Sequence, residues 1–212
     1  MNLMTDITNQ ILKLQEQSAS GEIIVIGISG PTGSGKSTLA DKVHDNLLFL
    51  GKSVLCFKMD WLLKERNFRE EELNNLISQQ TVMPFESTQH INLNLVHNFL
   101  KQTRHFNKGL LNPEHKCINS EPFILEKVYN RGNGLSNDRK ELHLEPNLII
   151  LIDGQYNLID YLDCYINLQI VLLVDLDILL QRLIMRANYR EPFFIKQYFF
   201  RVNMPSILRY LS

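Results

Sequence analysis

The sequence has few cysteines and no charge excess of either sign. Its three cysteines are Cys56, Cys117 and Cys164, and no two of them form a C-x-x-C pair. An odd, scattered set of this kind indicates neither a disulfide framework nor a zinc site, and it favours a reducing compartment. We therefore expect a cytoplasmic protein with unpaired thiols.

The charges of the chain nearly cancel, with 22 Lys and Arg residues against 23 Asp and Glu residues. This balance gives no global electrostatic reason to bind nucleic acid or an anionic membrane. The longest apolar runs, Leu148–Ile152 and Ile170–Val174, are far shorter than the ~20 residues that a membrane-spanning helix needs. We expect neither nucleic acid nor membrane as a partner.

The sequence does have the composition of a globular domain, with 44% hydrophobic and 21% charged residues over 212 positions. Short apolar runs alternate with amphipathic stretches, which predicts an α/β fold with a parallel sheet covered by helices on both faces. We expect one domain, 1–212, with an N-terminal helix in 1–20 and a core in 21–212. The other predicted helices are 35–50, 61–80, 91–102, 176–188 and 192–211, and the predicted strands are 22–28, 53–58, 123–129, 148–152 and 168–174. Residues 103–122 and 131–146 are predicted to be irregular.

The first predicted strand leads directly into Gly30–Thr38, which has the pattern G-x-x-x-x-G-K-S of a Walker A P-loop. Glycines allow the tight turn that points backbone N–H groups at a phosphate, and the following helix adds its positive dipole end. Lys36 can reach the β- and γ-phosphates, and the Ser37 hydroxyl can ligate Mg²⁺. We therefore predict ATP and Mg²⁺ as cofactors. The expected nucleotide contacts are Gly30, Thr32, Gly33, Ser34, Gly35, Lys36, Ser37 and Thr38.

Two acids follow predicted strands, where ligands bind in parallel α/β folds. Asp153 comes directly after 148–152, the Walker B pattern, and is expected beside the metal; the alternative is a helix cap. Asp60 lies two residues beyond 53–58. Its carboxylate could accept the proton of a substrate hydroxyl or hold a metal-bound water, and it could also cap the next helix.

The chain has neither the N-K-x-D motif of a GTPase nor the L-S-G-G-Q motif of a transporter ATPase. This leaves the small-molecule kinases, in which a short lid supplies arginines. Arg182, Arg186 and Arg190 are spaced by four and would share one helical face. Their guanidinium groups suit bidentate contact with phosphate oxygens. Arg131, Arg139 and Lys140, on the predicted loop after the 123–129 strand, could meet an anionic acceptor. The alternative is a mobile surface loop.

The order of these motifs resembles the uridine kinase and phosphoribulokinase family, which also includes pantothenate kinases. The resemblance runs over roughly 22–205 and implies a nucleoside-kinase-like P-loop NTPase fold, with an acceptor-side segment at about 81–146 and an arginine-bearing lid at about 182–195. It rests on the P-loop, Met59-Asp60, Phe85-Glu86, Val128-Tyr129, Ile152-Asp153-Gly154 and the lid arginines.

The resemblance also implies roles for single residues. Asp60 would be the catalytic base, and Ser37, Asp60 and Asp153 would surround Mg²⁺. Lys36, Arg186 and Arg190 would contact the phosphates, while Glu86 and Tyr129 would contact the acceptor.

The function expected from these residues is an ATP-dependent kinase, similar to uridine kinase, that phosphorylates a hydroxyl of a small molecule. One alternative is a regulatory P-loop protein that binds nucleotide without turnover. Others are a kinase for a pantothenate- or sugar-type acceptor, or for an acceptor that is already anionic, such as a sulfate or phosphate ester. The choice of ATP over GTP and the oligomeric state stay open, a homo-oligomer included.

Overall fold

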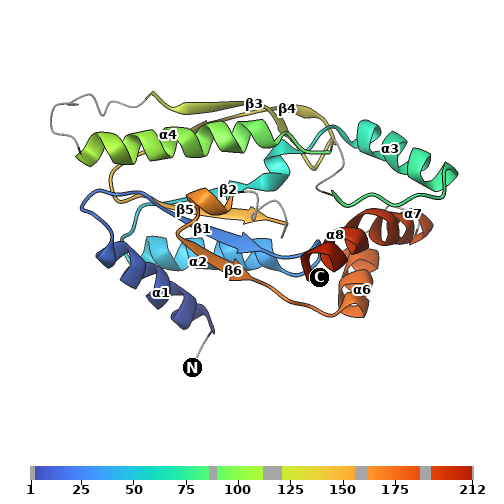
Figure 1. The fold of residues 1–212 in the computed structure, drawn as a ribbon, viewed down its shortest axis with the longest axis horizontal. Helices are drawn as coiled ribbons and strands as arrows, with labels where there is room; N and C mark the ends of the chain where they lie inside the picture. The colour runs from blue at the N-terminus through green and yellow to red at the C-terminus, as the bar shows by residue number, and fades with distance from the viewer. Residues whose placement is uncertain (1–2, 86–89, 112–120, 156–161, 187–191, 212) are drawn as a thin grey trace.

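A computed structural model of the chain describes residues 3–85, 90–111, 121–155, 162–186 and 192–211 (Figure 1). Its centre is a parallel sheet of four strands in the order β2-β5-β1-β6. These strands confirm the predicted parallel sheet. Their bounds are Ile24–Ser29 for β1, Val54–Lys58 for β2, Ile149–Gly154 for β5 and Leu168–Val171 for β6.

Strand β1 is buried along its whole length, which is why its sequence is continuously apolar rather than alternating. Ile23 and Val25 pack into one hydrophobic cluster, while Ile24 and Ile26 pack into another on the opposite face. Helices α1 (Leu3–Gln17) and α2 (Lys36–Phe49) cover the second face, and α4 (Leu93–Leu111) covers the first (Figure 1). The prediction of helices on both faces is confirmed.

Helix α4 is longer than the sequence predicts, because 103–111 is helical and not irregular. Tertiary contacts, rather than an apolar sequence, stabilise this last part of the helix. Phe106 is buried in the core. The Asn107 side chain accepts from the Ile23 N–H and donates to the Ile23 carbonyl, both at 2.9 Å. These contacts bind a polar stretch of helix to the amino end of β1.

The region 131–146 was expected to be a loop and instead contains strand β4 (Ser136–Leu142), which pairs antiparallel with β3 (Phe123–Tyr129) in a separate two-stranded sheet. Only Leu142 of β4 is buried, so the strand carries no apolar signal. The turn between the strands is closed by N–H bonds from Asn130 to the Leu135 carbonyl and from Gly134 to the Asn130 carbonyl, both 2.8 Å. Asn130 and the glycines were therefore signs of a hairpin.

The predicted helix 61–80 is divided into a 3₁₀ turn, η1 (Met59–Leu62), and helix α3 (Arg66–Ser78). The C-terminal part comprises α6 (Leu176–Arg186), α7 (Pro192–Tyr198), a π-helical turn, η4 (Phe199–Asn203), and α8 (Met204–Leu211). Helices α3, α6, α7 and α8 gather at the end of the molecule towards which the strands point (Figure 1). They surround the carboxyl edge of the sheet.

Two expectations drawn from the composition can also be compared with the structure. Among the described helices, none is both long and apolar enough to cross a bilayer. Within the described residues, Cys56 and Cys164 are free thiols. Burial raises the pKa of the Cys56 thiol to about 12, so this cysteine stays protonated and unreactive.

The packing of α4 on the sheet generates a first prediction. Phe99 is completely buried and its ring stacks on that of Phe57 at a centroid distance of 5.2 Å. Phe99→Ala should lower the free energy of unfolding by ~3–5 kcal/mol through lost burial and a residual cavity. Urea denaturation measures this. Phe49→Ala is the matched control: the Phe49 side chain is 87% exposed, and its loss should cost no more than about 0.5 kcal/mol. Equal effects of the two changes would contradict the assigned packing.

Candidate active site

The loop between β1 and α2 has a backbone that requires glycine. Gly33 and Gly35 have φ angles of 91° and 95°, in the left-handed region that other residues rarely adopt. A Cβ at Gly30 would lie 2.7 Å from the Ser34 Oγ and 3.2 Å from the Leu172 Cβ. The P-loop motif therefore has the turn and the close approach that its sequence predicts.

Two side chains from other elements hold this loop from outside. Arg182 of α6 donates from Nη1 to the carbonyls of Gly33 and Ser34, at 3.2 and 3.3 Å. Gln155, just after β5, donates from Nε2 to the Thr32 Oγ1 at 3.0 Å. The spacing by four had placed Arg182 among the lid arginines, but in the structure it supports the P-loop backbone. The spacing does not distinguish Arg182 from Arg186; only the family resemblance assigns the phosphates to Arg186 and Arg190 and not to Arg182.

Lys36, the P-loop lysine, lies among charged groups from three other elements. Burial is the main cause that lowers the pKa of Lys36; the negative charge of Asp153 opposes it, and the positive charges of Arg131 and Arg186 add to it. Asp153 comes from β5, Arg131 from the β3–β4 turn and Arg186 from the end of α6. These residues, all predicted for the site, are thus brought to one place.

Asp153 provides a test of whether the residues fit a metal ion. It is 5% exposed, and no hydrogen-bond donor in the described part of the chain reaches its Oδ1. A buried carboxylate oxygen without a partner is costly, so it fits a cation that binds there. The described residues contain no group of three or more His, Cys, Asp or Glu that could hold a metal. Mg²⁺ does not need one, since it usually binds through one or two carboxylates and substrate phosphates.

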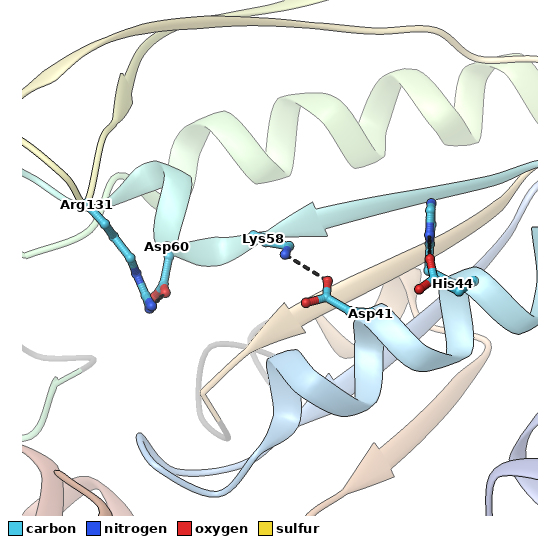
Figure 2. Close-up of polar contacts among 6 residues, drawn as sticks. Asp41, His44, Lys58, Asp60 and Arg131 are labelled. Atoms are coloured by element: carbon cyan, nitrogen blue, oxygen red, sulfur yellow. Dashed lines mark hydrogen bonds and ion pairs between the residues drawn. The ribbon is translucent and has the colours of Figure 1, made fainter. Parts of the chain in front are cut away.

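Asp60 lies in η1, directly beyond the carboxyl end of β2, and its carboxylate forms an ion pair with the guanidinium group of Arg131 (Figure 2). The alternative role as a helix cap is not seen, because the residue before α3 is Glu65 and the one before η1 is Lys58. A second ion pair lies nearby, between Lys58 and Asp41 of α2 at 2.8 Å (Figure 2). The candidate base therefore has a positively charged partner in the structure.

The structure distributes the remaining predicted residues as follows. Tyr129, at the end of β3, is buried, and the guanidinium group of Arg69 lies 4.8 Å from its ring centroid. Thr38 is exposed in the first turn of α2. Glu86 and Arg190 lie outside the described residues.

A cavity of about 330 Å³ opens beside the P-loop. Among the described residues, its polar lining consists of Thr32, Arg69, Arg186, Tyr198 and Asn203. Sequence reasoning missed Arg69, because it belongs to the charged run 64–72, which contains no recognisable motif. It also missed Asn203, which follows no motif. The π-helical turn that carries Asn203 is a local irregularity that is visible in the structure alone.

Comparison with known proteins places this site in a kinase fold. No family model matches the chain. A protein assigned as the kinase of a fructose transport system in Silicibacter sp. TM1040 superposes with a TM-score of 0.67 over 99% of this chain and 95% of that one, at 16% identity. The chain has a P-loop kinase fold. This confirms the fold class predicted from the sequence.

Two relatives agree with the resemblance drawn from the motifs. A uridine kinase of Geobacillus sp. is 28% identical over 131 residues, which are 62% of this chain and 51% of that protein. The uncharacterized kinase mug58 of Schizosaccharomyces pombe is 40% identical over 62 residues, 28% of this chain and 22% of that protein. The chain thus matches about half of the length of one relative and about a fifth of the other.

The P-loop geometry generates a second prediction, with a matched control. Gly35 and Gly51 both have positive φ angles, 95° and 73°, and open space where a Cβ would lie. Replacing either by Ala should cost about 1–2 kcal/mol of stability through backbone strain. Gly35→Ala should also weaken Mg-ATP binding about tenfold, the equivalent of ~1.4 kcal/mol, whereas Gly51→Ala should bind normally. Isothermal titration calorimetry measures the binding, and equal Kd values for both variants would argue against a nucleotide at this loop.

Proposed function

We propose that the protein is a kinase that transfers the γ-phosphate of ATP to a hydroxyl group of a small molecule. One observation carries this proposal: Lys36, Asp153, Arg186 and the Asp60–Arg131 pair converge beside the P-loop, next to a cavity that could hold an acceptor. The kinase fold and the uridine kinase relative support it.

In this proposal, catalysis is mainly positioning and electrostatic stabilisation, as phosphoryl transfer generally requires. The P-loop backbone binds the triphosphate, and the Lys36 ammonium group contacts the β- and γ-phosphate oxygens. Arg186 stabilises the charge that develops on the transferred group. Arg182 holds the loop in shape through its carbonyls.

Ser37 and Asp153 are the residues that would hold Mg²⁺, which when bound would neutralise charge on the phosphate oxygens. The unpartnered Oδ1 of Asp153 supports this assignment. Asp60 lies at the same edge of the sheet, because β2 pairs in parallel with β5 and Lys58 lies opposite Asp153.

Asp60 is proposed as the base that accepts the proton of the acceptor hydroxyl as its oxygen attacks the γ-phosphorus. The guanidinium group of Arg131 pairs with this carboxylate before the acceptor arrives. With 41% of the Asp60 side chain and 72% of the Arg131 side chain exposed, a ligand can reach both groups. The proposal includes a cytoplasmic location, as the scattered cysteines favour.

The same ion pair favours a second candidate function, a nucleotide-binding regulatory protein without turnover. In the structure, the partner of the Asp60 carboxylate is Arg131, so an acceptor hydroxyl must compete for it. ADP formation distinguishes the two functions. A kinase forms ADP faster when a hydroxylated compound is added, whereas a regulatory protein binds Mg-ATP and shows no such stimulation.

The base assignment generates a third prediction. Asp60→Asn should bind Mg-ATP with unchanged affinity, since the proposed contact of Asp60 is with the acceptor hydroxyl and not with the nucleotide. Its acceptor-dependent kcat should fall by about 10²–10⁴-fold, the usual contribution of general base catalysis. Steady-state kinetics and calorimetry together measure both quantities.

Asp41→Asn is the matched control, because Asp41 also forms an ion pair near the end of β2 but lies on α2 (Figure 2). It should change kcat by no more than about threefold, as expected for a partly exposed ion pair. If Asp60→Asn retains wild-type turnover, Asp60 is not the base.

A further inference from the structure

The cavity beside the P-loop has a charge that bears on what it can bind. Its described lining includes two guanidinium groups, Arg69 and Arg186, and no carboxylate. Arg186 lies close enough to Lys36 to affect its pKa, so it belongs to the phosphate side of the cavity. Arg69 comes from α3, a different element. Arg69 is therefore a second positive charge in the lining, contributed by a different helix from Arg186.

Arg69 is held in place in a way that suits recognition. Its Nε donates to the Lys64 carbonyl at 2.9 Å, and its guanidinium group lies 4.8 Å from the Tyr129 ring centroid. Neither contact uses the two terminal nitrogens, which have no hydrogen-bond or ion-pair partner within the described residues. A planar guanidinium fixed at one edge and one face presents its other edge to a carboxylate or phosphate.

Asn203 is an independent sign of a ligand in the same cavity. It is 3% exposed and lines the cavity, and no donor in the described part of the chain reaches its Oδ1. Leaving a buried acceptor unpaired is unfavourable, and a hydroxyl donor on a ligand would remove that cost. Asn203 ends a π-helical turn, a feature often found at functional sites.

We infer that the cavity binds a small hydroxylated anion, a hydroxy acid or a phosphate ester of a polyol, with its acidic group on Arg69 and a hydroxyl donated to Asn203. This inference rests on the proposed kinase function and names the class of its acceptor. A volume of about 330 Å³ is near the lower end of the usual 300–1,000 Å³ for ligand pockets, which favours a small molecule.

The inference assigns Tyr129 a role that differs from direct contact with the acceptor. Tyr129 is buried, with its ring against the Arg69 guanidinium group. It therefore acts through Arg69, as a positioning residue. The aromatic face attracts the guanidinium group and so limits the orientations it can take.

Matched pairs of acceptors test the class. The pairs are glycerate with glycerol, and ribose 5-phosphate with ribose; each pair differs chiefly in the anionic group, a carboxylate in one and a phosphate in the other. Acceptor-stimulated ADP formation and calorimetric binding are measured for all four compounds with the full chain and Mg-ATP or a non-hydrolysable analogue. An anionic member should bind and turn over at least about tenfold better than its neutral partner.

Variants of Arg69 test the residue. Arg69→Gln should raise the KM of the anionic acceptor about 10–100-fold, the equivalent of a lost charged hydrogen bond, and leave the KM of ATP unchanged. Arg69→Lys should restore part of the loss. Arg104→Gln is the matched control, since Arg104 also lies over a tyrosine ring, that of Tyr165, but lines a different cavity. It should behave as wild type.

Asn203→Leu provides a second variant, expected to lower kcat/KM for the same acceptor about tenfold by removing the hydroxyl acceptor. Circular dichroism and thermal unfolding confirm that each variant is folded. If Asn203→Leu does not fold, the Arg69 variants alone decide the inference.

The outcomes separate this inference from the proposed function. Turnover that is equal for neutral and anionic partners, or that is insensitive to Arg69→Gln, overturns the anionic class while the kinase function stands. Saturable binding of an anion that Arg69→Gln abolishes, without turnover, supports the cavity assignment and counts against the kinase. If neither anion binds or turns over, the inference is wrong.

Discussion

The parallel register of three strands is the constraint on which the site depends. Strand β5 pairs with β2 on one side and β1 on the other, so Asp153 lies opposite Lys58 and opposite Ile28. The P-loop, the candidate metal acid and the candidate base therefore leave the sheet at the same edge. A shift of one residue would turn the Asp153 side chain to the other face. The complete burial of β1 and β5 on both faces prevents such a shift, because every alternative register would exchange the residues of two packed clusters.

Around this edge, positive charge from several elements is concentrated in a small space. Lys36, Arg131 and Arg186 repel one another, and the carboxylates of Asp153 and Asp60 compensate only in part. An arrangement of this kind is costly for an empty site and favourable once polyphosphate binds. The same positive charges thus repel one another in the free protein and attract an anionic ligand.

The parts of the site that could be predicted from sequence are those with local causes. Gly33 and Gly35 were predictable because their backbone angles strongly favour glycine, and Asp153 because it follows a run of apolar strand residues. Strand β4 was missed because its side chains mostly face solvent, and the end of α4 because Asn107 bonds to a strand 84 residues away. Arg69 and Asn203 escaped for the same reason: tertiary packing alone decides that they line one cavity.

The π-helical turn before α8 has a consequence for how the C-terminal helix joins the rest of the protein. Pro205 lacks an N–H and cannot donate to the Arg201 carbonyl four residues earlier. That carbonyl accepts instead from the backbone of Met83, at 2.9 Å, and Ser206 Oγ accepts from the Phe85 N–H at 2.7 Å. Pro205 therefore interrupts the helical hydrogen bonds and leaves the Arg201 carbonyl available to Met83, which is distant in sequence. Two hydrogen bonds thus join the C-terminal helical segment to residues 83–85. One of them uses the Arg201 carbonyl, which in an uninterrupted helix would accept a bond from within the helix.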